Sequence, residues 1–142
     1  MLKKFRRFGN VYIVRLDRDE EIIETLKGFC AANQITLGWV SGIGAVNRVT
    51  LGLFETKPKR YVAEELSGDF EITALSGNIT TMNKEVYLHL HATISDLQHK
   101  TYGGHLTSAV VSATVELIVV SVAGVVERKF SQEIGLNLLE FC

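Results

Sequence analysis

The pattern of hydrophobic and polar residues predicts one helix followed by a long series of strands. Apolar residues recur at helical spacing over residues 18–32, at Ile22, Ile23, Leu26, Phe29 and Cys30. This periodicity is typical of an amphipathic helix with one face in a core. Asp17, with Glu20 three residues later, predicts an N-cap and capping box at its start. Most of the remaining chain has the alternation or the apolar runs that strands require.

About eight strands are expected, so the predicted fold class is α+β. They cover residues 10–16, 35–44, 45–55, 60–66, 70–81, 86–95, 106–122 and 126–132. We expect a single compact domain over residues 1–142, with a strongly twisted, mainly antiparallel or mixed, barrel-like sheet and one main helix at 18–32. One helix cannot cover so large an apolar sheet. The other face therefore needs a further layer, which a subunit interface would supply.

Composition narrows the possible functions. The net charge of −1 excludes a whole-molecule basic field for gripping DNA. The two cysteines, Cys30 and Cys142, are too few for a disulfide framework and favour a reducing, cytoplasmic environment. Residues 101–126 carry only one charge, Glu116, but their glycine, valine, serine and threonine content predicts buried strands, and we expect no membrane association.

The first nine residues are basic, with Lys3, Lys4, Arg6 and Arg7 between apolar side chains. One interpretation is a short arm that contacts phosphate or a membrane. The other, which we favour, is a solvated terminus or an edge strand.

All four histidines lie between residues 86 and 105. On a strand over 86–95, His89 and His91 share the polar face, roughly 7 Å apart. They offer two of the three ligands that catalytic zinc sites use, and His105 offers a third. If residues 96–104 formed a plain hairpin loop, His105 would lie opposite Ser95, about 13 Å from His91.

A shared metal therefore requires that the 96–104 loop fold back over the sheet, aided by Gly103 and Gly104, or that another strand pairing or another subunit supply the third ligand. The alternative is a polar strand face whose histidines are exposed or hydrogen-bonded. His99 is expected to be a solvated loop residue.

Glu116 has two interpretations. It forms an ion pair with Arg15, Arg48 or Arg128, or it acts as a general base or outer partner near the metal.

Five segments together resemble the plant and prokaryote conserved (PPC) domain family: SGIGAVNRVTL (41–51), GDFEITALSGNI (68–79), LHLHATISD (88–96), GGHL (103–106) and TVEL (114–117). The resemblance implies an α+β subunit that assembles as a homotrimer. Prokaryotic members are single-domain and are labelled DNA-binding by analogy with plant proteins, whose AT-hook this chain lacks. His89, His91 and His105 match positions that resemble zinc sites in prokaryotic members. Acetolactate decarboxylase, placed in the same fold group, holds zinc with a similar histidine set.

The resemblance therefore implies a trimer with a tri-histidine site for zinc or another divalent metal. One hypothesis is an enzyme acting on a small oxygen-rich molecule, in which Glu116 or Tyr102 moves protons and Arg48 holds an anion. A second is DNA binding through the basic residues of the N-terminus. A third is a non-catalytic interaction module.

Overall fold

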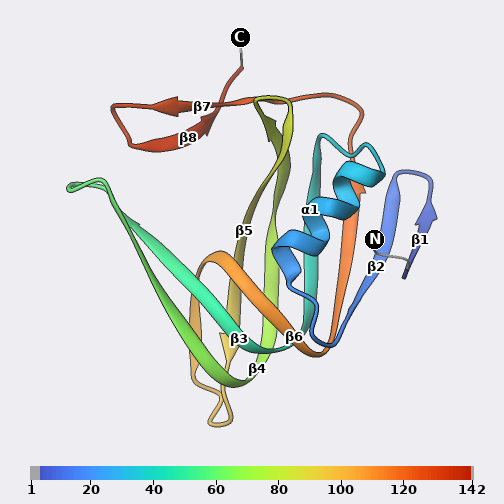
Figure 1. The fold of residues 1–142 in the computed structure, drawn as a ribbon, viewed down its shortest axis with the longest axis vertical. Coiled ribbons are helices and arrows are strands. Elements are labelled where there is room, and N and C mark those ends of the chain that lie inside the picture. Colours follow the sequence, from blue (N-terminus) through green and yellow to red (C-terminus); the bar gives the residue numbers. More distant parts are fainter. Residues whose placement is uncertain (1–3, 142) are drawn as a thin grey trace.

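The computed structural model describes residues 4–141. One helix and eight strands follow one another in the described chain (Figure 1). In order, they are β1 (Phe5–Phe8), β2 (Val11–Asp17), α1 (Ile22–Ala32), β3 (Gly38–Glu55), β4 (Arg60–Met82), β5 (Glu85–Ser95), β6 (Thr101–Ser121), β7 (Arg128–Ser131) and β8 (Leu136–Leu139). The α+β fold class predicted from the sequence is confirmed. None of the described helices is long and apolar enough to cross a membrane.

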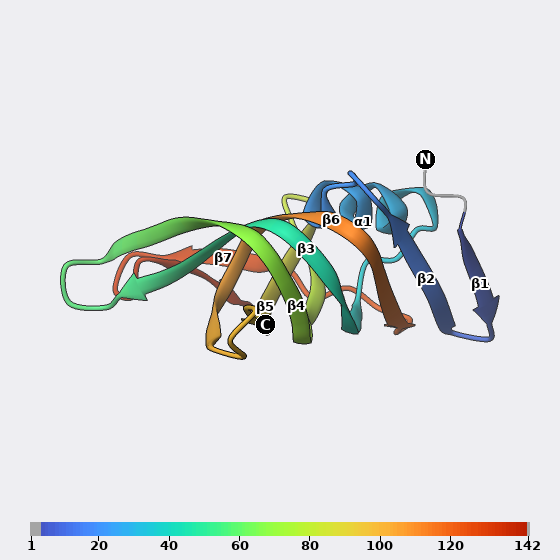
Figure 2. The ribbon, with the colours of Figure 1, turned by 90° about the horizontal axis from the view of Figure 1, so that it is seen from below.

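The main sheet is antiparallel and closes partly on itself. Its strand order is β1-β2-β6-β3-β4-β5, and the first part of β6 pairs again with β5. The strands β6, β3, β4 and β5 are thus bonded in a partial ring rather than a complete barrel. Figure 2 shows how strongly the long strands arch to reach this second pairing. The strands β7 and β8 form a separate two-stranded sheet.

Two strands are much longer than the sequence pattern predicts, because each joins two segments that were expected to be separate strands. The expected strands at 35–44 and 45–55 are one strand, β3, and those at 60–66 and 70–81 are one strand, β4. Register shifts at Gly42/Gly44 and Val46/Arg48 absorb the irregular pattern without ending β3. The break expected between the strands at 60–66 and 70–81 is wrong, because Gly68 stays within β4 at a φ of 142°.

The helix begins later than predicted. Glu21, not Asp17, is the N-cap, and its carboxylate accepts hydrogen bonds from the backbone N–H of Ile23 and Glu24. Asp17 instead ends β2, and its backbone N–H donates to the Glu20 carboxylate. Asp17 and Glu20, which the sequence predicts to form a capping box, therefore close the turn before the helix.

The core lies between α1 and one face of the sheet. Leu26, Phe29 and Cys30 of the helix are buried together with Leu90 and Ile94 of β5. Burial of each large apolar side chain stabilises the fold by roughly 1.5–3 kcal/mol. Burial also raises the pKa of the Cys30 thiol to about 12, so this cysteine stays a neutral core residue.

The opposite sheet face is covered at one end, where Arg128 of β7 lies against Asn78 and Thr80, but residues 4–141 supply no covering layer over its apolar part. Trp39, Ile43 and Ile118 are 52%, 57% and 48% exposed on this face, which we call the outer face. Hydrogen-bonded neighbours place Ile118, Ser41, Ser76 and His91 in one row across it. The apolar part of the outer face thus runs through small polar residues to the histidines.

Candidate metal centre

The β5–β6 hairpin brings the three histidines together. On β5, His89 and His91 point to the outer face, while Leu90 and Ala92 between and beside them are buried in the core. The hairpin register places His105 of β6 directly opposite His91. The expected 96–104 loop is wrong, since β6 already begins at Thr101 and no loop has to fold back over the sheet.

Asp96 holds the hairpin turn short. Its Oδ1 atom accepts hydrogen bonds from the backbone N–H of Gln98 and Lys100, at 2.9 and 3.0 Å. Its Oδ2 atom accepts one from the Tyr102 hydroxyl, at 3.1 Å. His99 lies in this turn with a φ of 64°, exposed as predicted.

Gly103 and Gly104 lie within β6 and do not form the sharp turn that their sequence suggests. A Cβ atom on Gly104 would lie 2.7 Å from the carbonyl oxygen of Gly52, so this glycine permits close contact between β6 and β3. The two glycines next to His105 therefore allow two strands to pair closely, and they do not reverse the chain.

The imidazoles are spaced as a metal site requires. The Nε2 atoms of His89 and His91 are 3.2 Å apart, and one ligand atom from each of the three histidines lies within 4.8 Å of the others. Two nitrogens bound to a tetrahedral zinc at about 2.0–2.1 Å lie roughly 3.3 Å apart. The His89–His91 pair already has this spacing, and the third ligand needs only a small side-chain movement.

The electrostatics favour neutral imidazoles, which are the form that binds metals. Burial, followed by Arg128 and the other two histidines, lowers the pKa of His89 to about 4. Burial and the neighbouring His91 also lower the pKa of His105. The imidazoles of His89 and His105 therefore resist protonation and present lone pairs without competing protons, which fits a divalent metal.

Two aromatic or cationic neighbours of the cluster were missed by the sequence analysis. The ring of Tyr61 stands edge-on to the His105 ring, 5.6 Å between centroids, and its hydroxyl is hydrogen-bonded to Thr107. Arg128, considered only as a partner for Glu116, lies beside His89 instead. Neither neighbour could be predicted from the sequence pattern of β5 or β6, because Tyr61 lies on β4 and Arg128 on β7.

The three weak catalytic candidates lie away from the histidines. Glu116 is exposed and lies two residues from Ile118 on β6. Ile118 is itself three strand spacings from His91, or roughly 14 Å across the sheet. Tyr102 registers with buried Ile94 and so faces the other side of the hairpin. Arg48 lies four residues along β3 from Gly52, the partner of His105, or roughly 13 Å.

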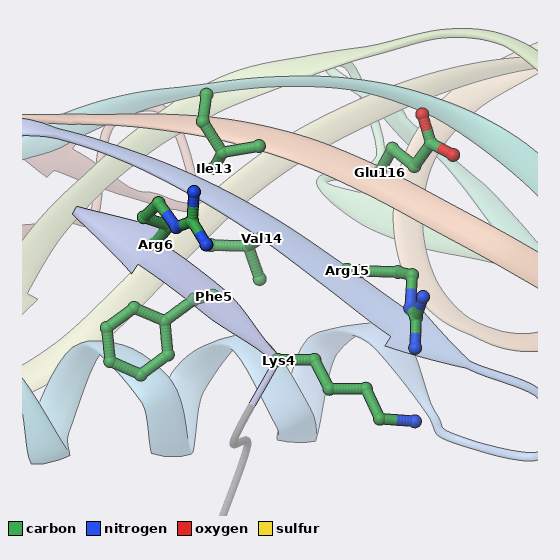
Figure 3. Close-up of a pocket in the computed structure, with 7 residues that line it drawn as sticks. All are labelled: Lys4, Phe5, Arg6, Ile13, Val14, Arg15 and Glu116. Atoms are coloured by element: carbon green, nitrogen blue, oxygen red, sulfur yellow. The ribbon is translucent and has the colours of Figure 1, made fainter. Parts of the chain in front are cut away.

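Glu116 makes no ion pair with its cross-strand neighbour Arg15. Figure 3 shows the two side chains pointing away from one another at a hollow of about 390 Å³ between β1, β2 and β6. Arg15 donates to Asp17 at 3.1 Å instead. Glu116 is the one charged residue in an apolar run, which suggested that it needs a counterion. Because its side chain is exposed to solvent, it does not need one.

The basic N-terminal residues are largely engaged within the fold. Lys4 is ion-paired with Asp17. Arg7 donates to the Gly9 carbonyl and its guanidinium lies over the Tyr12 ring. Arg6 lines the hollow of Figure 3, and Lys3 lies outside the described residues. The segment Phe5–Phe8 is an edge strand, the interpretation favoured from the sequence.

Comparison with protein families identifies the class of this chain. Residues 3–123 match the family model described as the Plants and Prokaryotes Conserved (PCC) domain. The match covers most of the chain, so the protein belongs to this family. The resemblance noted in the sequence is confirmed.

Solved structures that match nearly the whole of this chain have the same fold. A candidate DNA-binding protein from Bacteroides thetaiotaomicron is 36% identical, with a TM-score of 0.95 over 97% of this chain and 96% of that one. A metal-containing protein from Archaeoglobus fulgidus is 30% identical, with a TM-score of 0.86 over 99% and 100%. A plant- and prokaryote-conserved (PPC) protein from Pyrococcus horikoshii is 27% identical, with a TM-score of 0.86 over 100% and 98%.

The chain also matches part of a larger protein. It is 31% identical over 125 residues to the bifunctional protein GlmU of Synechococcus sp. (strain JA-3-3Ab). The match covers 87% of this chain but only 18% of that protein, so the chain spans less than a fifth of the length of this relative.

We expect the metal-free protein to lose stability in acid partly through His89. Its imidazole takes up a proton near pH 6.5 in the unfolded chain, but only near pH 4 in the folded protein. Between these values the unfolded state binds more protons, so stability falls as the pH falls; above pH 6.5 this residue has no effect. Urea unfolding after chelation should show a smaller loss between about pH 7 and about pH 5 for His89→Gln than for the wild type.

The matched control is His99→Gln, which changes an exposed turn histidine and should follow the wild type. Equal acid losses in the wild type and His89→Gln would contradict the assignment of a depressed pKa to His89.

Proposed function

We propose that this protein binds a divalent metal ion, zinc in the first instance, through His89, His91 and His105. The observation that carries the proposal is the convergence of three ligand atoms within 4.8 Å on one hairpin. Imidazole nitrogens suit zinc and other late transition metals, whereas magnesium and calcium prefer oxygen ligands. A zinc held by three histidines keeps one position open and supplies Lewis-acid chemistry, polarising a carbonyl or activating water.

Two further observations support the metal proposal. The relative from Archaeoglobus fulgidus, similar over its whole length, is described as metal-containing. In this chain, burial and neighbouring histidines disfavour the protonated forms of His89 and His105, which would compete with a metal.

DNA binding has weaker support from the described residues. The Bacteroides relative is described as a candidate DNA-binding protein. However, Lys4 is already paired with Asp17, and Arg7 with Gly9 and Tyr12. The net charge of −1 adds no general attraction to phosphate. We therefore place DNA binding second, and we place a metal-dependent enzyme acting on a small oxygen-rich molecule as the natural extension of the metal site.

The wild-type protein, purified without a histidine tag and dialysed after incubation with zinc, should retain about one zinc per chain by elemental analysis. His91→Ala removes one of the three ligands and should retain little zinc. His99→Ala, in the adjacent turn, is the matched control and should retain the wild-type amount.

Zinc should also raise the melting temperature of the wild type and of His99→Ala but not of His91→Ala, because a ligand that binds only the folded state stabilises it. Absence of zinc from the wild type, or equal zinc in all three proteins, would contradict the proposed site.

We further propose that the protein is a homotrimer whose subunits contact one another through the outer face. Trp39, Ile43 and Ile118 are large and about half exposed on this face. A contiguous apolar surface of this kind is typical of a subunit interface. The histidine site lies at the edge of the same face, through the row Ile118–Ser41–Ser76–His91. Assembly would therefore help to shield the site from water.

Light scattering after gel filtration should give the mass of three chains for the wild type. Ile118→Glu places a charge at the centre of the apolar part of the outer face and should shift the mass toward one chain. Leu97→Glu makes the same kind of change at a side chain that is more exposed, in the β5–β6 turn, and should leave the mass unchanged. A monomeric wild type, or a trimeric Ile118→Glu, would contradict the proposed interface.

A further inference from the structure

We propose that the ligand of the histidine site is a small oxyanion, a carboxylate or a phosphate ester, whose negative charge faces Arg128. This inference rests on the proposed metal site and names the chemical class of molecule that the site takes. It assigns to Arg128 the anion-holding role for which the sequence suggested Arg48.

Arg128 is a buried cation without a counterion among the described residues, 4–141. Its side chain, at the start of β7, is only 9% exposed. Three of its five N–H groups donate to neutral acceptors, the Thr80 hydroxyl at 2.8 Å, the Asn137 carbonyl at 2.9 Å and the Asn78 side-chain oxygen at 2.8 Å. The guanidinium carbon also lies 4.8 Å from the centre of the Tyr87 ring.

No carboxylate of residues 4–141 forms an ion pair with Arg128. The adjacent Glu127 is turned toward the β4–β5 hairpin, where its Oε1 atom accepts a hydrogen bond from the backbone N–H of Lys84. A buried charge is costly unless an opposite charge accompanies it. The neutral acceptors orient the guanidinium without neutralising it.

Arg128 lies beside the histidine cluster, so a counterion for it would bind at the proposed metal site. Asn78, which accepts from Arg128, lies directly opposite His89 across the β4–β5 ladder. Tyr87, beneath the guanidinium, is two residues before His89 on the same face of β5. Side chains directly opposite in an antiparallel pair have Cβ atoms about 5 Å apart. The guanidinium therefore stands next to the place where the imidazoles converge.

A divalent metal on neutral histidines would place a second positive charge beside this arginine. Like charges repel strongly where water is partly excluded, and the described residues of the cluster bring no negative charge to offset them. A small anion resolves both problems, since one of its oxygens can occupy the open metal position while its charge faces the remaining N–H groups of Arg128. Carboxylates and phosphates are the anions that a guanidinium holds best.

The surroundings restrict the size and character of the anion. Ser76, opposite His91, and Asn78, opposite His89, offer small polar side chains on the outer face. The Tyr61 ring stands against His105 on another side of the cluster. The site thus suits a compact polar molecule better than a long apolar one.

The test uses full-length protein loaded with cobalt(II), whose visible spectrum reports its ligands, and titrates acetate and inorganic phosphate as separate probes. At least one of the two anions should change the spectrum of the wild type saturably. Arg128→Gln should weaken binding of the effective anion by at least about tenfold while cobalt content stays unchanged. Arg48→Gln, which alters an exposed arginine remote from the site, is the matched control and should bind as the wild type does.

A second variant keeps Arg128 and supplies its missing counterion. Asn78→Asp, isosteric at the atom that already accepts from Arg128, should weaken anion binding by a similar factor and raise the melting temperature of the metal-free protein. It also keeps the test decisive if Arg128→Gln does not fold.

The outcomes separate the two proposals. Failure of the wild type to bind cobalt overturns the metal site and this inference together. Cobalt binding with no response to either anion overturns this inference alone, as does unchanged anion affinity in Arg128→Gln or, where that variant does not fold, in Asn78→Asp. A response to acetate only, or to phosphate only, supports the proposal and identifies the head group.

Discussion

The register between β5 and β6 is the constraint on which the candidate site depends. Because Ser95 pairs with Thr101, His91 must lie opposite His105. Asp96 maintains this register by accepting two backbone hydrogen bonds and one from Tyr102. A shift of one residue would turn His105 toward the core and place an apolar neighbour beside His91. A charged turn residue that binds no ligand thus determines whether three imidazoles meet.

The same strand, β6, connects the site to the rest of the molecule. Its first part pairs with β5 at the histidines, its later part pairs with β2, and β3 pairs with both parts. Because β6 pairs with different strands along its length, the strands of the sheet must be long and arched. β3 achieves this curvature through bulges near its glycines. It also produces one continuous outer face, on which exposed apolar residues and the histidine cluster are neighbours. Assembly and ligand binding are therefore expected to involve adjacent parts of one surface.

Much of the fold could be predicted from residues that are close in sequence. Alternation along β5 separated His89 and His91 from buried Leu90 and Ala92, and helical spacing identified the buried face of α1. What could not be predicted depends on pairing between distant strands. Gly103 and Gly104 suggest a turn, but the backbone of Gly52 approaches them, and this contact keeps them in β6. Likewise, nothing near Arg128 in the sequence indicates that Asn78 holds it beside His89. The family resemblance supplied the match of His105 with the other two histidines before the register explained it.

The most direct test of the account is anomalous diffraction at the zinc absorption edge from crystals of the zinc-loaded protein. The account predicts one strong peak per chain, about 2.0–2.1 Å from a ring nitrogen of each of His89, His91 and His105, with a non-protein oxygen completing a tetrahedron. A peak bound to other residues, or none at the three histidines, would contradict the central claim that this hairpin is a metal site.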